Sequence, residues 1–227
     1  RRLYALVALA FAVLIFAGFA RTYYLRGLIT SHEISTLVHL HGITMTAWVM
    51  LFVTQVFLIS SKRIKLHMRL GIAGIALAAL LVVVGYLTSV TATRVGTPSA
   101  PPDIPPLVFL IVPLGDLLMF VIFFAGAIYY RKKAANHKRL MLLTVITLLP
   151  PAIARIPIES LQSLGPLWFY GFPDAILLGL LIFDTWHNRR LNKLFAVGAV
   201  LLIASHPLRL IFGGTEMWQN FAAWLVG

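Results

Sequence analysis

Seven histidines are the side chains of this sequence best suited to chemistry. Neutral imidazole is the commonest side-chain ligand for haem iron and for other transition metals. Their positions along the apolar segments form two sets, one of His32, His39, His41 and His206 and the other of His67, His137 and His187. Two sets near opposite surfaces of a bilayer would suit two haem groups that carry electrons across it.

Two histidine pairs are the predicted cofactor ligands. His41 with His206 would form the outer pair, and His67 with His137 the inner pair. Each histidine also has a simpler interpretation, in which water, lipid phosphates or a neighbouring helix satisfies the ring. Both interpretations stay open at this point.

Gln55 and Arg155 are the polar residues predicted to orient such a cofactor or to contact its propionates. A metal ion bound by His39 and His41 is a further candidate. These two residues are two positions apart, so on a regular helix their side chains point about 200° apart. Both can bind one ion only where the backbone is not helical.

A polar stripe occupies the second apolar segment. His41, Trp48 and Gln55 are seven residues apart, so on a helix they share one face. A face of this kind is expected to point into a helix bundle. Interhelical hydrogen bonds explain it without a cofactor, and a contact with a cofactor, lipid or quinone is the alternative.

Two acidic residues are predicted to be buried charges, Asp116 and Glu159. Asp116 lies about nine residues into an apolar segment, or about 14 Å along a helix. An ionised carboxylate is costly at that depth and needs a donor or a proton. Glu159 is four residues after Arg155 and could pair with it. A functional pocket and a structural network of salt bridges both fit these positions.

These residues lie in or beside long apolar segments. Of the 227 residues, 60% are hydrophobic and only 11% are charged, which is typical of a membrane protein. About 20 helical residues cross the hydrocarbon core of a bilayer. The sequence therefore predicts an all-α bundle of seven transmembrane helices, forming a single integral membrane domain over residues 1–227, with an interfacial amphipathic segment over 214–227. The predicted spans are 3–20, 36–59, 70–93, 107–130, 140–158, 172–186 (beginning nearer Pro166) and 194–212.

The basic residues predict an orientation. Of the 19 Lys and Arg residues, 14 lie before the first span or between spans two and three, four and five, and six and seven. The positive-inside rule then places the N-terminus in the cytoplasm and the C-terminus outside. The net charge of +12 is concentrated in these basic loops, where it would attract anionic lipid headgroups. Membrane lipids are therefore the expected partners, and a nucleic-acid partner is not expected.

Several classes of protein are excluded by missing residues. The chain has no cysteine, which excludes disulfides, iron–sulfur clusters and thiolate metal sites. It has no G-x-x-x-x-G-K phosphate loop and no H-E-x-x-H zinc motif. All lysines fall in the basic loops, so no lysine in the seventh span can hold retinal.

Short landmarks carry a resemblance to a known group. His39, Gln55, His67 before Leu70-Gly71, then His137-Lys138-Arg139 and Arg155, follow one another along residues 36–158. This pattern resembles a family of uncharacterised bacterial polytopic membrane proteins, and its layout is similar in outline to b-type cytochromes. The resemblance implies a bacterial inner-membrane location and supplies no activity.

Three functions remain as hypotheses. The first is a redox or electron-transfer protein that binds haem b or a metal through histidine. The second is a non-catalytic accessory, assembly or scaffold subunit of a larger membrane complex. The third is a carrier that binds quinone or lipid at Asp116 and an outer polar pocket. No residue is predicted to be catalytic.

Overall fold

The computed structural model describes residues 2–29, 33–96 and 104–227, and every regular element in these ranges is a helix. His32 lies outside the described residues. The chain divides into two compact units. Unit 1 comprises Arg1–Thr88 and Pro151–Glu159, and unit 2 comprises Ser89–Pro150 and Ser160–Gly227.

Six helices of the described residues are long and apolar enough to cross a membrane, and they correspond to six of the seven predicted spans. The chain is therefore a multi-pass membrane protein. The span beginning at Pro166 confirms the earlier start expected for that segment. The six are Tyr4–Tyr24, Thr36–Ser60, Ile64–Val95, Pro106–Tyr129, Pro166–Asn188 and Lys193–Gly213.

The segment predicted as the fifth span, 140–158, forms two helices instead of one. Helix α6 covers Ala134–Ile146, a turn follows, and helix α7 covers Pro150–Ala154. Proline lacks a backbone N–H and disfavours helical geometry in the residue before it, so Pro150 stops the first helix. Both prolines then occupy the first turn of α7, where the missing N–H groups would have no helical partner anyway.

Unit 1 is built from helices α1 (Arg2–Phe19) and α2 (Thr36–Ser60), the larger part of α3 (Ile64–Val95), and α7. Ser35 caps α2, since its side chain accepts a bond from the backbone N–H of Val38. At the end of α1, Gly18 lies directly against the backbone of Ala152 in α7. Because glycine has no side chain, α1 and α7 can pack directly against each other at this position.

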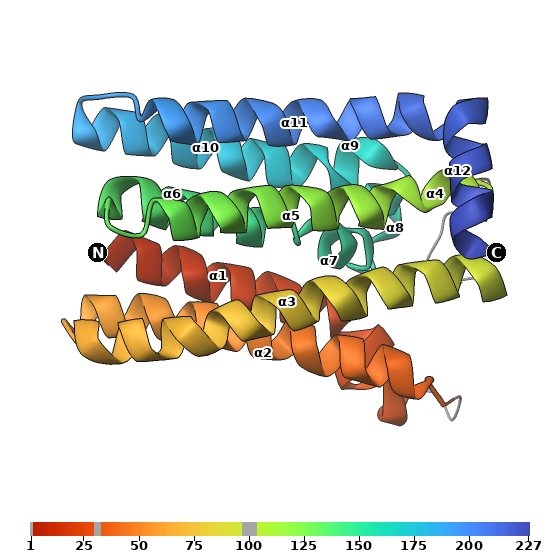
Figure 1. Ribbon diagram of the computed structural model, residues 1–227, viewed down its shortest axis with the longest axis horizontal. Helices are drawn as coiled ribbons and strands as arrows, with labels where there is room; N and C mark the ends of the chain where they lie inside the picture. Colours follow the sequence, from red (N-terminus) through yellow and green to blue (C-terminus); the bar gives the residue numbers. More distant parts are fainter. Residues whose placement is uncertain (1, 30–32, 97–103) are drawn as a thin grey trace. The chain divides into compact units, whose positions relative to one another are not determined.

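Unit 2 contains α4 (Pro106–Phe109), α5 (Ile111–Tyr129), α6, α8 (Glu159–Gln162, except its first residue), α9 (Pro166–Phe169), α10 (Gly171–Asn188), α11 (Lys193–Gly213) and α12 (Glu216–Val226). Within this unit, the α5–α6 and α10–α11 turns lie at the same end (Figure 1). The side-chain amide of Asn192 donates to Asn136 Oδ1 at 2.9 Å and joins the two turns.

Helix α12 closes the other end of unit 2, where it runs across the ends of α4 and α11 (Figure 1). The indole N–H of Trp218 donates to the carbonyl of Leu107 at 2.8 Å. Arg94, in the last turn of α3, donates to the carbonyl of Val226. Residues 214–227 thus contain a helix that is held near both of its ends, and the interfacial position of this segment stays a prediction.

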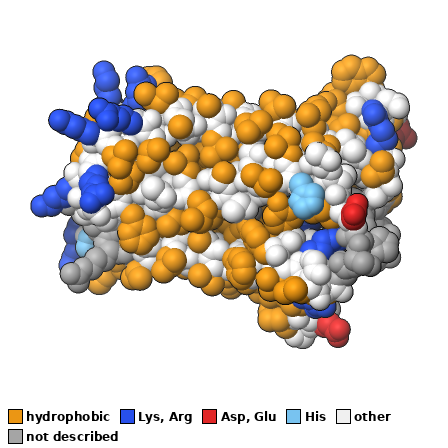
Figure 2. All heavy atoms as spheres, turned by 90° about the horizontal axis from the view of Figure 1, so that it is seen from below, with side chains coloured by type: hydrophobic (Ala, Val, Ile, Leu, Met, Phe, Trp, Pro, Cys, Tyr) orange, Lys and Arg blue, Asp and Glu red, His pale blue; other side chains and the backbone are white. Residues whose placement is uncertain are grey.

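The surface is largely apolar. Figure 2 shows hydrophobic side chains over much of the visible face, with few charged side chains among them. Exposed side chains include those of Leu6, Phe16, Met50, Ile182 and Val200 on the membrane-crossing helices. Such residues are stable against lipid and would be unfavourable in water.

Candidate functional site

Buried polar side chains concentrate in unit 2. All but one of the eight buried polar or charged side chains of the described residues belong to it. A buried charge in a membrane helix needs a partner and is by default a functional candidate. The eight are Thr44, which belongs to unit 1, and Asp116, Arg139, Thr144, Thr147, Asp184, His206 and Arg209.

Asp116 of α5 and Arg209 of α11 form a buried ion pair. The guanidinium donates from Nη1 to the carboxylate and from Nη2 to Ser205 Oγ at 3.0 Å. The donor expected for Asp116 is therefore Arg209. Gly115 makes the pair possible, because a Cβ atom there would lie 2.4 Å from Arg209 Nε.

A second polar group adjoins the first on the neighbouring turn of α11. His206 Nδ1 lies 3.1 Å from Asp174 Oδ2, and the His206 ring stacks on Tyr170 with centroids 4.2 Å apart and planes 13° apart. His206 and Asp116 are within electrostatic reach of each other. Tyr170 is also within electrostatic reach of Asp116 and Arg209. The five side chains therefore form one cluster, called here the His206 cluster.

Two buried polar atoms of this cluster have no hydrogen-bond partner among the described residues: His206 Nε2 and Asp174 Oδ1. A buried polar atom without a partner costs about 1–3 kcal/mol. Such atoms in a native protein point to a water, ion or ligand that completes them. The His206 cluster is thus built to accept a further polar group.

The contact with Asp174 sets the chemistry of His206. A neutral imidazole that donates from Nδ1 to a carboxylate carries its lone pair on Nε2. Histidines that bind a metal commonly have this arrangement, in which a carboxylate orients the ring and raises its basicity. The same lone pair can accept a hydrogen bond, and a protonated ring can donate one.

A surface hollow of unit 2 reaches the cluster at Arg209. Its walls are apolar apart from that guanidinium. The hollow is lined by Ile104, Pro105, Val108, Phe109, Ile111, Val112, Arg209 and Leu210.

A second buried ion pair lies at the other end of unit 2. Arg139 Nε donates to Asp184 Oδ2 at 2.8 Å, and Nη2 donates to Oδ1 at 2.9 Å. Asn188 adds a bond to Asp184 Oδ1 at 3.1 Å. This paired-fork geometry ties α6 to α10. His137, two residues before Arg139, has Nδ1 2.8 Å from the carbonyl of Ala127.

The histidines of unit 1 lie in different surroundings. Gln55 Nε2 donates to the backbone carbonyl of His67 at 3.2 Å, which joins α2 to the start of α3. His39 is exposed, and its backbone carbonyl accepts a bond from the Tyr23 hydroxyl at 3.2 Å. His41 is half-buried and lies close enough to Arg155 for the guanidinium charge to act on its ring.

The predicted metal site at His39 and His41 does not form. Both residues lie in the regular first turns of α2, so their rings point about 200° apart and cannot bind one ion. The positive charge of Arg155 beside His41 further disfavours a cation there. Nowhere in the described part of the chain do three His, Asp or Glu side chains gather as a metal site.

Glu159 is not a buried charge. It is exposed at the first residue of α8, and it forms no ion pair with Arg155. The helix predicted to carry both residues ends at Ala154, which removes the four-residue spacing that would place them together. A carboxylate in the first turn of a helix is instead stabilised by the helix dipole.

The predicted histidine pairs are each divided between the units. His41 and His67 belong to unit 1, and His206 and His137 belong to unit 2. Pairing of these residues on a shared cofactor stays a prediction. Within unit 2, His206 and His137 both have Nδ1 beside an oxygen atom, which is the orientation a ligand histidine needs.

Most residues of the buried networks were not among the predicted site residues, and three of them show why. Tyr170 precedes α10 and reads as an interfacial aromatic residue, and Ser205 is a common residue in a membrane helix. Asp184 was the one detectable signal, because it is an acidic residue within an apolar segment. A buried acid there requires a basic partner, and Arg139 is that partner.

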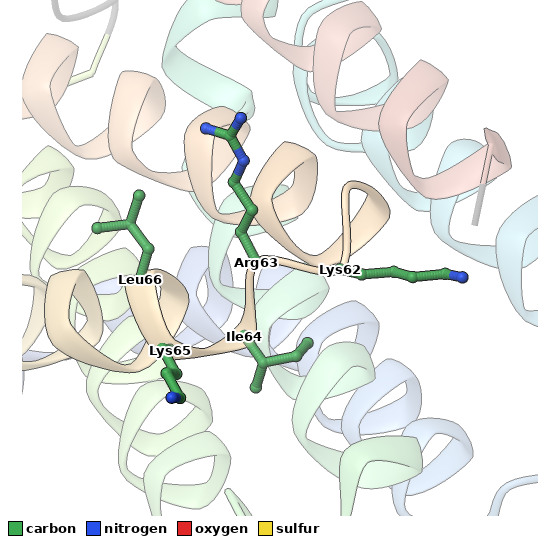
Figure 3. A pocket seen from close by; sticks show the side chains of 5 residues that line it. All are labelled: Lys62, Arg63, Ile64, Lys65 and Leu66. Carbon is green, nitrogen blue, oxygen red and sulfur yellow. The ribbon is translucent and has the colours of Figure 1, made fainter.

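A second surface hollow lies at the α2–α3 turn of unit 1, lined by Lys62, Arg63, Ile64, Lys65 and Leu66. Figure 3 shows its basic side chains pointing in different directions from the turn. They do not converge on one point, so they form a diffuse positive surface and not a built anion site.

Comparison with protein-family models, curated proteins and solved structures finds no match for this chain.

Proposed function

We propose that the protein is a membrane electron-transfer protein whose His206 cluster holds a redox group, with haem b as the first candidate. The observation that carries the proposal is that His206 Nδ1 faces the Asp174 carboxylate while Nε2 is buried without a partner. Haem b bound at Nε2 would supply a one-electron couple. Arg209 and Tyr170 would add polar groups around it.

A seventh crossing by α6 and α7 and an N-terminus in the cytoplasm are part of this proposal. Two basic turns, α5–α6 and α10–α11, lie at the same end of unit 2. A further crossing of the membrane through 134–170 would account for this arrangement. With that crossing the three basic turns of the sequence share one side, as the positive-inside rule requires. A bacterial inner membrane is the proposed location.

Cysteine labelling tests this orientation directly, because the natural chain has no cysteine. Lys132→Cys and Arg190→Cys are expected to react with a membrane-impermeant maleimide only after cell lysis. Leu28→Cys and Met217→Cys are expected to react in intact cells. Labelling of Lys132→Cys and Arg190→Cys from opposite sides would contradict the seven-span arrangement.

The redox proposal predicts a reduced-minus-oxidised visible spectrum with a sharp b-haem band for the detergent-purified protein. His206→Ala is expected to abolish the band or shift it, because no other group of the cluster offers a nitrogen lone pair. His187→Ala is the matched control, since His187 is exposed at the end of α10 and stacks only on Phe183. A flat spectrum from well-folded protein supplied with haem would contradict haem binding.

A quinone is the second candidate, favoured by one further observation. The Tyr170 hydroxyl is a second buried polar group beside His206, and the hollow at Arg209 has mostly apolar walls. Two hydrogen-bonding groups suit the carbonyl of a quinone, and the walls suit its ring and tail. Organic extraction of the same purified sample distinguishes the two candidates, because a quinone would be found in the extract. A flat spectrum with no extracted quinone would leave the accessory-subunit hypothesis.

A further inference from the structure

Arg155 of unit 1 is a guanidinium held in place without a counter-charge. It lies 5.0 Å over the ring of Phe19 and donates from Nη1 to the carbonyl of Pro151 at 2.8 Å. The aromatic face and the carbonyl fix the direction of the group. Neither carries a full negative charge, and most of the five N–H donors of the guanidinium remain for another partner.

The described residues supply no carboxylate for Arg155. Unit 1 has only Glu33 and Glu159, both of which are exposed, and Arg155 forms an ion pair with neither. The carboxylates on the membrane helices of unit 2 have partners of their own. Asp116 pairs with Arg209, Asp174 with His206, and Asp184 with Arg139. Among the described residues, each of these carboxylates is therefore either exposed or paired with another side chain.

His41 belongs to the same unit and lies within electrostatic reach of Arg155. The positive charge of the guanidinium repels a cation and attracts an oxyanion. His41 lies five residues after the start of α2, which is about 8 Å along the helix, and Phe19 is the last residue of α1. This depth is close to the level of lipid headgroups.

We propose that Arg155 and His41 form a binding site for a phosphate group. The planar fork of arginine matches two phosphate oxygens, and the imidazole N–H can donate to a third. An anionic lipid headgroup and free phosphate present the same chemistry. This site belongs to unit 1 and is independent of the His206 cluster.

Binding is tested with the full-length protein in nanodiscs by thermal unfolding and native mass spectrometry. One arm compares phosphatidylglycerol with phosphatidylcholine, and the other titrates inorganic phosphate into phosphatidylcholine nanodiscs. A rise in Tm with phosphatidylglycerol alone identifies a lipid headgroup, and a rise with inorganic phosphate identifies a soluble ligand. No rise in either arm overturns the proposal.

Variants assign the effect to the site. Arg155→Gln is expected to remove the rise in Tm, and His41→Gln to weaken binding about tenfold. Arg155→Lys keeps the charge without the fork and is expected to bind more weakly than the natural chain, which keeps the test valid if Arg155→Gln does not fold. Arg21→Gln is the matched control, because Arg21 is exposed in the same unit. Equal losses in Arg155→Lys and Arg21→Gln would contradict the assignment.

Discussion

Arg209→Met is expected to lower the free energy of unfolding by about 3–5 kcal/mol, the usual cost of leaving one partner of a buried ion pair alone. The variant leaves the carboxylate of Asp116, a residue that is only 5% exposed, without its basic partner. It also removes the bond to Ser205 Oγ. Reversible unfolding of the purified protein in mixed micelles measures the difference.

The double variant Asp116→Leu with Arg209→Met separates the charge from the packing. Removing both charges replaces the pair by apolar side chains of similar size, which is often neutral or stabilising. We therefore expect the double variant to be more stable than Arg209→Met. A double variant as unstable as the sum of the two single variants would show that the two charges do not stabilise each other.

Gly18→Ala is expected to destabilise unit 1 by about 3 kcal/mol or more, the upper range for overpacking in a packed interior. The added Cβ would lie 2.1 Å from the carbonyl oxygen of Ala152, and a backbone atom cannot move aside as a side chain can. Thermal unfolding of the purified variant measures the loss.

Gly27→Ala is the matched control, because nothing lies within 4 Å of a Cβ at that position. Alanine elsewhere in a helix is commonly favoured over glycine by about 0.5–1 kcal/mol. Equal effects of the two substitutions would show that α1 and α7 can separate at little cost, and that their contact does not hold unit 1 together.

The long helices could be predicted from the sequence, because in lipid an apolar run of about 20 residues has few alternatives to a helix. Helix α2 begins at Thr36 as expected and α11 covers the predicted span, with Pro207 inside it. The fifth predicted span was different for a local reason. Its hydropathy fits a membrane segment, but Pro150 and Pro151 interrupt the helix.

The candidate site could be predicted only in part. The depth of Asp116 in its apolar segment indicated that a donor must lie beside it, and Arg209 is that donor. His206 is buried, and its role as a cofactor ligand stays a prediction. The identity of the donor could not be derived, because Arg209 is 93 residues away and helix rotation decides which side chains meet. Glu159 was misplaced because the expected helix does not extend to it.

Gly115 has an evolutionary consequence. The guanidinium of Arg209 occupies the space that any side chain at position 115 would need. The two positions are therefore expected to covary among homologues. In homologues with a side chain at position 115, we expect position 209 to lack arginine. Position 116 should then lack an acidic residue, so the three positions should change together.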